Sequence, residues 1–112
     1  MKFKAMIAAI VLSLALPVTA QADIVQKAYE VALSNVRLPR TPTGTIALKE
    51  CDRCDYVVLR VGADTLYRLD GKPVRLSDFR AALARVADRD GEAVTVLHHL
   101  ERNQVTEVSV NL

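Results

Sequence analysis

The chain has 112 residues, of which 51% are hydrophobic, and its formal net charge is +2 at pH 7. This length allows one domain at most. Both excess positive charges come from Lys2 and Lys4, so the rest of the chain balances thirteen cations against thirteen acids. This balance argues against nucleic-acid and anionic-membrane partners, because both require a concentrated basic excess.

Residues 1–22 have the pattern of a cleaved secretory signal peptide. Lys2 and Lys4 form a positive start, residues 5–16 are apolar, and Pro17 precedes the small-x-small motif Ala20-Gln21-Ala22. A retained membrane anchor is the alternative, but the apolar run is shorter than the ~20 residues that a spanning helix needs. We therefore expect cleavage after Ala22 and a periplasmic or secreted protein, with no membrane contact after cleavage.

Residues 23–36 are predicted to form an N-terminal helix. Val25, Ala28, Ala32 and Val36 recur at the helical spacing and form one weak apolar stripe. Residues 37–44 contain two prolines, which favour extended backbone and exclude a helix there. We interpret them as a stiff connector that leads into the domain of residues 45–112.

A β-hairpin with a C-x-x-C at its tip is predicted for residues 45–61. If Cys51 faces Cys54, then Leu48 faces Val57 and Ile46 faces Leu59. This register places the four aliphatic side chains on one face of the hairpin. The two cysteines would then lie within reach of each other.

Residues 65–69 are predicted to form a third strand, and residues 72–74 a short return strand whose Pro73 favours a sheet edge. Asp70-Gly71 between them is a tight-turn signal. A covering helix is predicted for residues 78–87, with Ser77 as its N-cap. The segment L-D-G-K-P-V-R-L-S-D-F, residues 69–79, resembles the strand-turn-strand-helix units of periplasmic Tol- and Exb-type domains. The resemblance implies a strand-turn-strand-helix arrangement for this segment, and we carry no function over from it.

Residues 93–100 and 105–112 are predicted to form the last two strands. Matching apolar to apolar residues places Val96 opposite Val110, with His98 facing inward and His99 outward. The predicted fold class is therefore α+β. It consists of an antiparallel sheet of four to five strands built from hairpins, one covering helix (78–87) and the N-terminal helix.

The C-x-x-C is the feature of the sequence at which chemistry could occur. A disulfide between Cys51 and Cys54 is the favoured interpretation, because opposed residues of an antiparallel pair have a suitable Cα separation and the protein is expected to be exported. A second interpretation is a zinc or copper site formed by Cys51, Cys54 and one of His98 and His99.

A thiol–disulfide redox site is a third interpretation of the two cysteines, and a pair of reduced thiols with no partner is a fourth. Against the redox site, the acidic residues Glu50, Asp52 and Asp55 disfavour a reactive thiolate.

The sequence has no nucleophile elbow, no glycine-rich phosphate loop and no H-E-x-x-H. The arginines after residue 22 are scattered singly, and we interpret them as a feature of composition rather than as an anion site. The sequence therefore predicts a small exported, non-enzymatic domain without a cofactor, whose role is in binding or structure. The edge at residues 72–74 is the predicted place for a protein partner.

Overall fold

The computed structural model describes residues 25–112. The predicted signal peptide, residues 1–22, lies outside the described residues. The described part of the chain forms eight strands, one α-helix and one 3-10 helix. In chain order these are β1 (Gln26–Ala32), η1 (Leu33–Asn35), β2 (Val36–Arg37), β3 (Thr45–Leu48), β4 (Val57–Arg60), β5 (Leu66–Leu69), β6 (Lys72–Val74), α1 (Leu76–Ala84), β7 (Ala93–His99) and β8 (Gln104–Val110).

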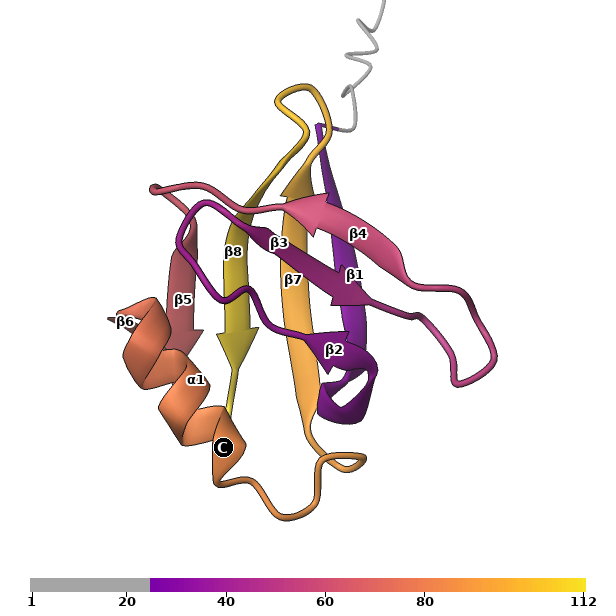
Figure 1. The fold of residues 1–112 in the computed structure, drawn as a ribbon, viewed down its shortest axis with the longest axis vertical. Helices are drawn as coiled ribbons and strands as arrows, with labels where there is room; N and C mark the ends of the chain where they lie inside the picture. The colour runs from indigo at the N-terminus through magenta and orange to yellow at the C-terminus, as the bar shows by residue number, and fades with distance from the viewer. Residues whose placement is uncertain (1–24) are drawn as a thin grey trace, which may run out of the picture.

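The strands form two sheets, one with the order β1-β7-β8-β5-β6 and one with the order β2-β3-β4. The α+β class is confirmed, but the prediction of a single antiparallel sheet is wrong. The larger sheet is mixed because β5 runs parallel to β8. Pairing adjacent segments into hairpins could not predict this contact, since the two strands are separated by β6, α1 and β7. Figure 1 shows the smaller sheet and α1 on the same side of the larger sheet.

The predicted N-terminal helix is wrong for its described residues, because residues 26–32 form strand β1. Tyr29 and Val31 are buried while Ala28 and Glu30 are exposed, which is the two-residue alternation of a strand. Strand β1 pairs with β7 and sets Val31 opposite Val94. The helical stripe would have buried small alanines, whereas the strand buries the larger Tyr29 and Val31 against an apolar partner strand.

The hairpin of β3 and β4 has the predicted register. Ile46 pairs with Leu59 and Leu48 with Val57, and Ile46, Leu48 and Leu59 are buried. The strands stop at Leu48 and Val57, so the connection is longer than a tight hairpin turn. The C-x-x-C therefore lies in a loop beyond the strands.

The helix α1 begins earlier and ends earlier than predicted. Its N-cap position is Arg75, whose carbonyl accepts the Phe79 N–H at 2.9 Å, and no described side chain caps the helix. The prediction of Ser77 as the N-cap is therefore wrong, and Ser77 lies in the first turn. Before the helix, Asp70 and Gly71 have φ angles of 54° and 84°, which are those of a tight hairpin turn between β5 and β6.

The β7–β8 pair differs from its predicted register by two residues. Val96 pairs with Val108, and Val110 pairs with Val94, with an irregularity between Leu97 and His98. Matching apolar residues could not choose between the two registers, because a shift of two residues keeps every side chain on the same face and Val96 meets a valine in both. His98 is buried, as predicted.

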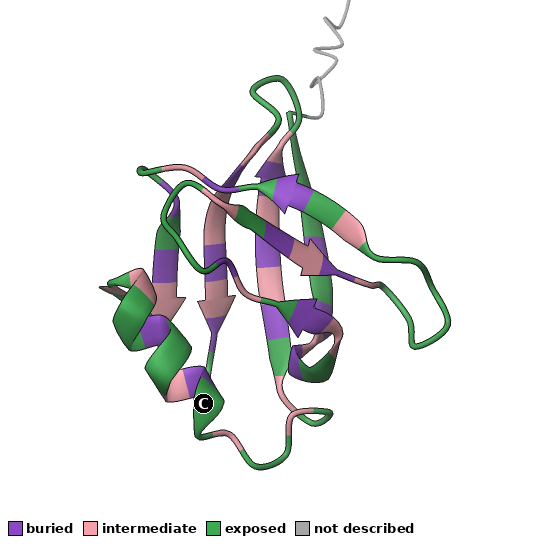
Figure 2. Cartoon of the chain, viewed as in Figure 1, coloured by how far each residue is buried: buried purple, intermediate pink, exposed green. Residues whose placement is uncertain are grey.

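One hydrophobic core fills the space between the two sheets and beneath α1. Figure 2 shows buried positions recurring along β7 and β8, whose alternate side chains face this space. Phe79 and Leu83 of α1 complete the core. The buried core residues are Tyr29, Val31, Leu33, Val36, Ile46, Leu48, Leu59, Val61, Tyr67, Phe79, Leu83, Val94, Val96, Val105, Val108 and Val110.

Candidate functional site

Cys51 and Cys54 form the predicted disulfide at the end of the β3–β4 hairpin. Their sulfur atoms are 1.98 Å apart and their Cα atoms 5.0 Å apart. The Cys54 N–H also donates a hydrogen bond to the Cys51 carbonyl at 3.1 Å, so the same two residues close a backbone turn. Both cysteines are exposed, and the loop that carries them projects from the domain (Figure 1).

Polar contacts tie the loop that carries the disulfide to β2 and η1. The Asn35 amide donates to the Asp52 carboxylate at 3.2 Å, and the Lys49 ammonium donates to the Asp52 carbonyl at 3.2 Å. The Arg37 guanidinium lies over the Tyr56 ring, 4.4 Å from the ring centroid, and the Lys49 ammonium lies 5.1 Å from the same centroid. These contacts give the loop a defined orientation.

The proposed metal ligands do not come together. His98 Nε2 lies 3.1 Å from Asn103 Oδ1, and His99 Nδ1 accepts the Arg102 N–H at 3.1 Å, so both histidines serve the β7–β8 loop. Residues 25–112 contain no group of three or more His, Cys, Asp or Glu side chains that could hold a metal ion. The zinc or copper interpretation is therefore wrong for the four residues that were predicted to form the site.

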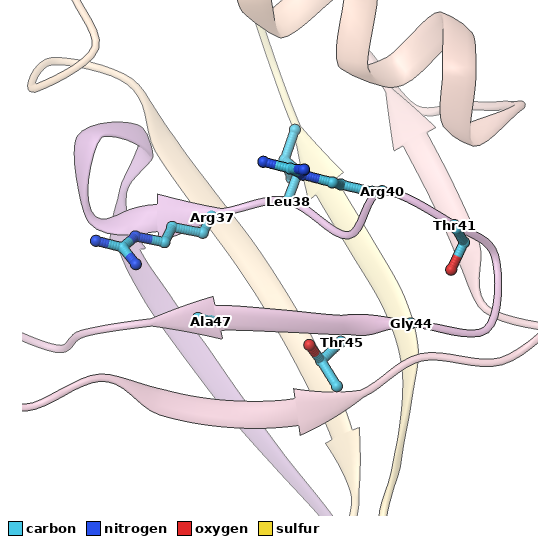
Figure 3. A pocket seen from close by; sticks show the side chains of 7 residues that line it. All are labelled: Arg37, Leu38, Arg40, Thr41, Gly44, Thr45 and Ala47. Carbon is cyan, nitrogen blue, oxygen red and sulfur yellow. The ribbon is translucent and has the colours of Figure 1, made fainter.

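The segment that follows β2 borders a hollow of about 360 Å³. Figure 3 shows Arg37, Leu38, Arg40 and Thr41 on one side of this hollow and Thr45 and Ala47 of β3 on the other. The Gly44 N–H donates to the Thr41 carbonyl at 3.1 Å and so closes the turn that leads into β3.

A second hollow, of about 430 Å³, lies between the same segment and the start of α1, and a third, of about 400 Å³, lies along α1. Arg40 lines both the first and the second, and Arg80 lines both the second and the third. None of the described Asp and Glu residues lines any of the three. The second hollow is lined by Arg40, Pro42, Arg75, Leu76, Ser77 and Arg80. The third is lined by Val36, Leu38, Arg80, Leu83, Ala84 and Arg89.

We call the five arginines that line these hollows the arginine surface: Arg37, Arg40, Arg75, Arg80 and Arg89. Two of them already have partners within the domain. Arg37 stacks on Tyr56, and the Arg89 guanidinium donates to the Leu83 carbonyl at 2.9 Å. The ion pair found within residues 25–112, Arg68 with Glu107 at 3.1 Å, involves none of the five.

Arg40, Arg75 and Arg80 therefore share one hollow with no carboxylate within 4.0 Å of them among the described residues. Guanidinium groups supply positive charge and N–H donors arranged as a fork, which is the chemistry that binds oxyanions. No sequence pattern indicated this grouping, because Arg40 is far from the other two along the chain and only the fold brings them together.

Tyr67 is a buried titratable group beneath α1. Its ring packs against Phe79 with the centroids 5.4 Å apart, and its hydroxyl has no hydrogen-bond partner within residues 25–112. Burial raises the pKa of Tyr67 to about 12. It does not line any of the three hollows, so we assign it to the core and not to the site.

Comparison with known proteins finds no matching family model, no matching curated protein and no matching solved structure. Within residues 25–112, no helix has the length and apolar character needed to cross a membrane. We therefore infer the function from the geometry of the described residues and from the sequence.

Proposed function

We propose that this chain is a small exported, non-enzymatic domain with a binding role, and that it works in the periplasm or outside the cell. The observation that carries the proposal is the disulfide between Cys51 and Cys54. Disulfides persist in oxidising compartments and are rare in the cytosol, where thiols are kept reduced. The signal-peptide pattern of residues 1–22 supports the same compartment independently.

The proposed role of the disulfide is to hold the shape of the loop at the hairpin tip. The ring that it closes is small, so the chain-entropy model gives a stabilisation of only about 2 kcal/mol. Both cysteines are exposed and lie outside the core. Losing the bond would therefore change the conformation of the tip more than the stability of the fold.

The binding role needs a surface, and the predicted sheet edge is a poor one. Strand β6 does lie at the edge of the five-stranded sheet, but it has only three residues. Its central residue, Pro73, has no N–H to offer a partner strand. The arginine surface is the stronger candidate, because three of its arginines line one hollow that no described carboxylate lines.

The test uses protein recovered from its native compartment. Mass spectrometry is expected to show an N-terminus at Asp23, and a thiol reagent is expected to label no cysteine before reduction and both after it. A Cys51→Ser/Cys54→Ser variant controls for background labelling. Labelling of both cysteines without reductant, in protein that retains residues 1–22, would overturn the proposal.

The same sample tests whether the cysteines bind a metal or carry out redox chemistry. Elemental analysis is expected to find no stoichiometric zinc or copper. After reduction, the alkylation rate is expected to match that of an ordinary cysteine peptide. A rate that indicates a strongly lowered thiol pKa would favour the redox interpretation, because the thiolate is the reactive form.

A further inference from the structure

We propose that the hollow between the β2–β3 segment and α1 binds the phosphate group of a small soluble phosphate ester, held by Arg40, Arg75 and Arg80. The inference rests on the binding role proposed above, but not on export or on the disulfide. It assigns a ligand class to one surface of the domain.

The three arginines come from separate positions that the fold brings together. Arg40 lies in the segment after β2, Arg75 at the N-cap position of α1, and Arg80 within α1. All three line the same hollow of about 430 Å³. Asp78, the acid in the first turn of α1, does not line it. The residues that line the hollow therefore include three cations and no acid.

The backbone that carries these arginines is well anchored. Phe79 and Leu83 of α1 are buried in the core, which holds the helix in place. Pro39, next to Arg40, is also fully buried, and it fixes the segment from the other side of the hollow. The backbone at the three arginines is therefore fixed before a ligand binds, so only the side chains must be ordered on binding.

A phosphate group matches these donors better than a carboxylate does. A phosphate monoester carries a charge of about −1.5 to −2 at pH 7 and has three strong acceptor oxygens. Three guanidinium groups and the Ser77 hydroxyl can supply donors to all three oxygens. A carboxylate has one charge and two oxygens, and a single arginine already satisfies both of them.

The size and the rest of the lining indicate an organic ester and not bare phosphate. The hollow falls within the roughly 300–1,000 Å³ range of small-molecule sites. Pro42 and Leu76 add apolar surface beside the cations. An organic group attached to the phosphate would cover this apolar surface, and inorganic phosphate would leave it in water.

The test is a calorimetric titration of the protein recovered from its native compartment, with phenyl phosphate, inorganic phosphate and benzoate as probes. We expect saturable, submillimolar binding of phenyl phosphate that weakens with added salt, and binding of the other two that is at least about tenfold weaker. Equal binding of benzoate and phenyl phosphate, or no saturable binding of any probe, would overturn the proposal.

Single substitutions locate the site. Arg40→Gln, Arg75→Gln and Arg80→Gln are each expected to weaken phenyl phosphate binding by about tenfold, since each removes a hydrogen bond between charged groups. Arg85→Gln is the matched control, because Arg85 is an exposed arginine at the end of α1 that does not line the hollow. Equal affinities in all four variants would show that the site lies elsewhere.

Two further measurements separate a soluble ester from a lipid headgroup, and phosphate binding from the disulfide. Vesicles of phosphatidylglycerol are expected not to retain the protein more than vesicles of phosphatidylcholine, and retention without binding of the soluble ester would replace the ester with a lipid headgroup. The Cys51→Ser/Cys54→Ser variant is expected to keep its affinity for phenyl phosphate. Phosphate binding can therefore fail while the disulfide and export results hold. Equally, the disulfide or export result can fail while phosphate binding holds.

Discussion

The strands of the β3–β4 hairpin and strand β1 all bury alternate residues, but their pairing partners lie at very different distances along the chain. In the hairpin, Ile46 and Leu59 are paired across a short loop. In β1, Gln26 pairs with His99, which lies near the other end of the chain. The hairpin carries the information for its pairing within its own segment. Strand β1 takes its conformation from a partner that forms much later in the sequence.

This difference explains why the sequence predicts one strand pair correctly and mistakes the other for a helix. A local pairing can be tested residue by residue within a short segment. The segment of β1 is compatible with both helical and strand spacing, and only the apolar face of β7 decides between them. Substitutions and pH changes can test this contrast.

Replacing Val31 by Asp tests directly whether residues 26–32 form a strand. Val31 is buried opposite Val94, so we expect a loss of about 4–5 kcal/mol in the free energy of unfolding. Ala28→Asp is the control, with a change within about 0.5 kcal/mol, because Ala28 is exposed. A helix would reverse the two results, since Ala28 would then face the core. Urea unfolding followed by circular dichroism measures both variants.

Replacing Ile46 by Ala tests the face of the hairpin that packs in the core. Ile46 is fully buried, so the expected loss is about 3 kcal/mol. Val58→Ala in β4 is the matched variant, with an expected loss of less than about 1 kcal/mol, because Val58 is 63% exposed. Urea unfolding measures both variants, and equal losses of unfolding free energy would mean that Val58 is packed as closely as Ile46.

Alkaline pH tests the core beneath α1. The pKa of Tyr67 is raised from 10.0 to about 12 in the folded protein, so folding keeps a proton that the unfolded chain releases above pH 10. The free energy of unfolding therefore keeps the Tyr67 contribution in full below pH 10 and falls by roughly 2–3 kcal/mol as the pH rises to 12. Tyr67→Phe is expected to lack this component and to be no less stable at pH 7, because the hydroxyl has no partner among the described residues. Urea unfolding of both proteins from pH 8 to 12 gives the difference, and parallel pH curves would contradict it.

Removing the disulfide is expected to have the smallest effect on stability. The Cys51→Ser/Cys54→Ser variant should lose about 2 kcal/mol or less, because the closed ring is small and lies outside the core. Amide exchange should increase at residues 49–56 and remain unchanged in β7. Faster exchange throughout the core would show that the bond supports the whole fold rather than the tip.

In the site, as in the fold, features set by neighbouring residues could be predicted from the sequence, and features set by distant segments could not. The Cys51–Cys54 bond could be predicted because the two cysteines are near neighbours within one hairpin. Arg40 and Arg80 have no such local relation, because their proximity depends on how the segment after β2 packs against α1. Ser77 has the right residue type for a cap, but Arg75 already accepts the first helical hydrogen bond. The position of β5 beside β8 is likewise set by the whole core and not by local pattern.

The pairing of β1 with β7 also has a consequence for how the chain reaches its native state. Strand β1 is synthesised before β7, and this partner becomes available only after more than sixty residues have followed β1. Contacts of such high sequence separation slow folding, because the loop must close before they contribute. Until then Tyr29 and Val31 remain in contact with water. We therefore expect β1 to dock late and to be the segment most exposed to aggregation before folding is complete.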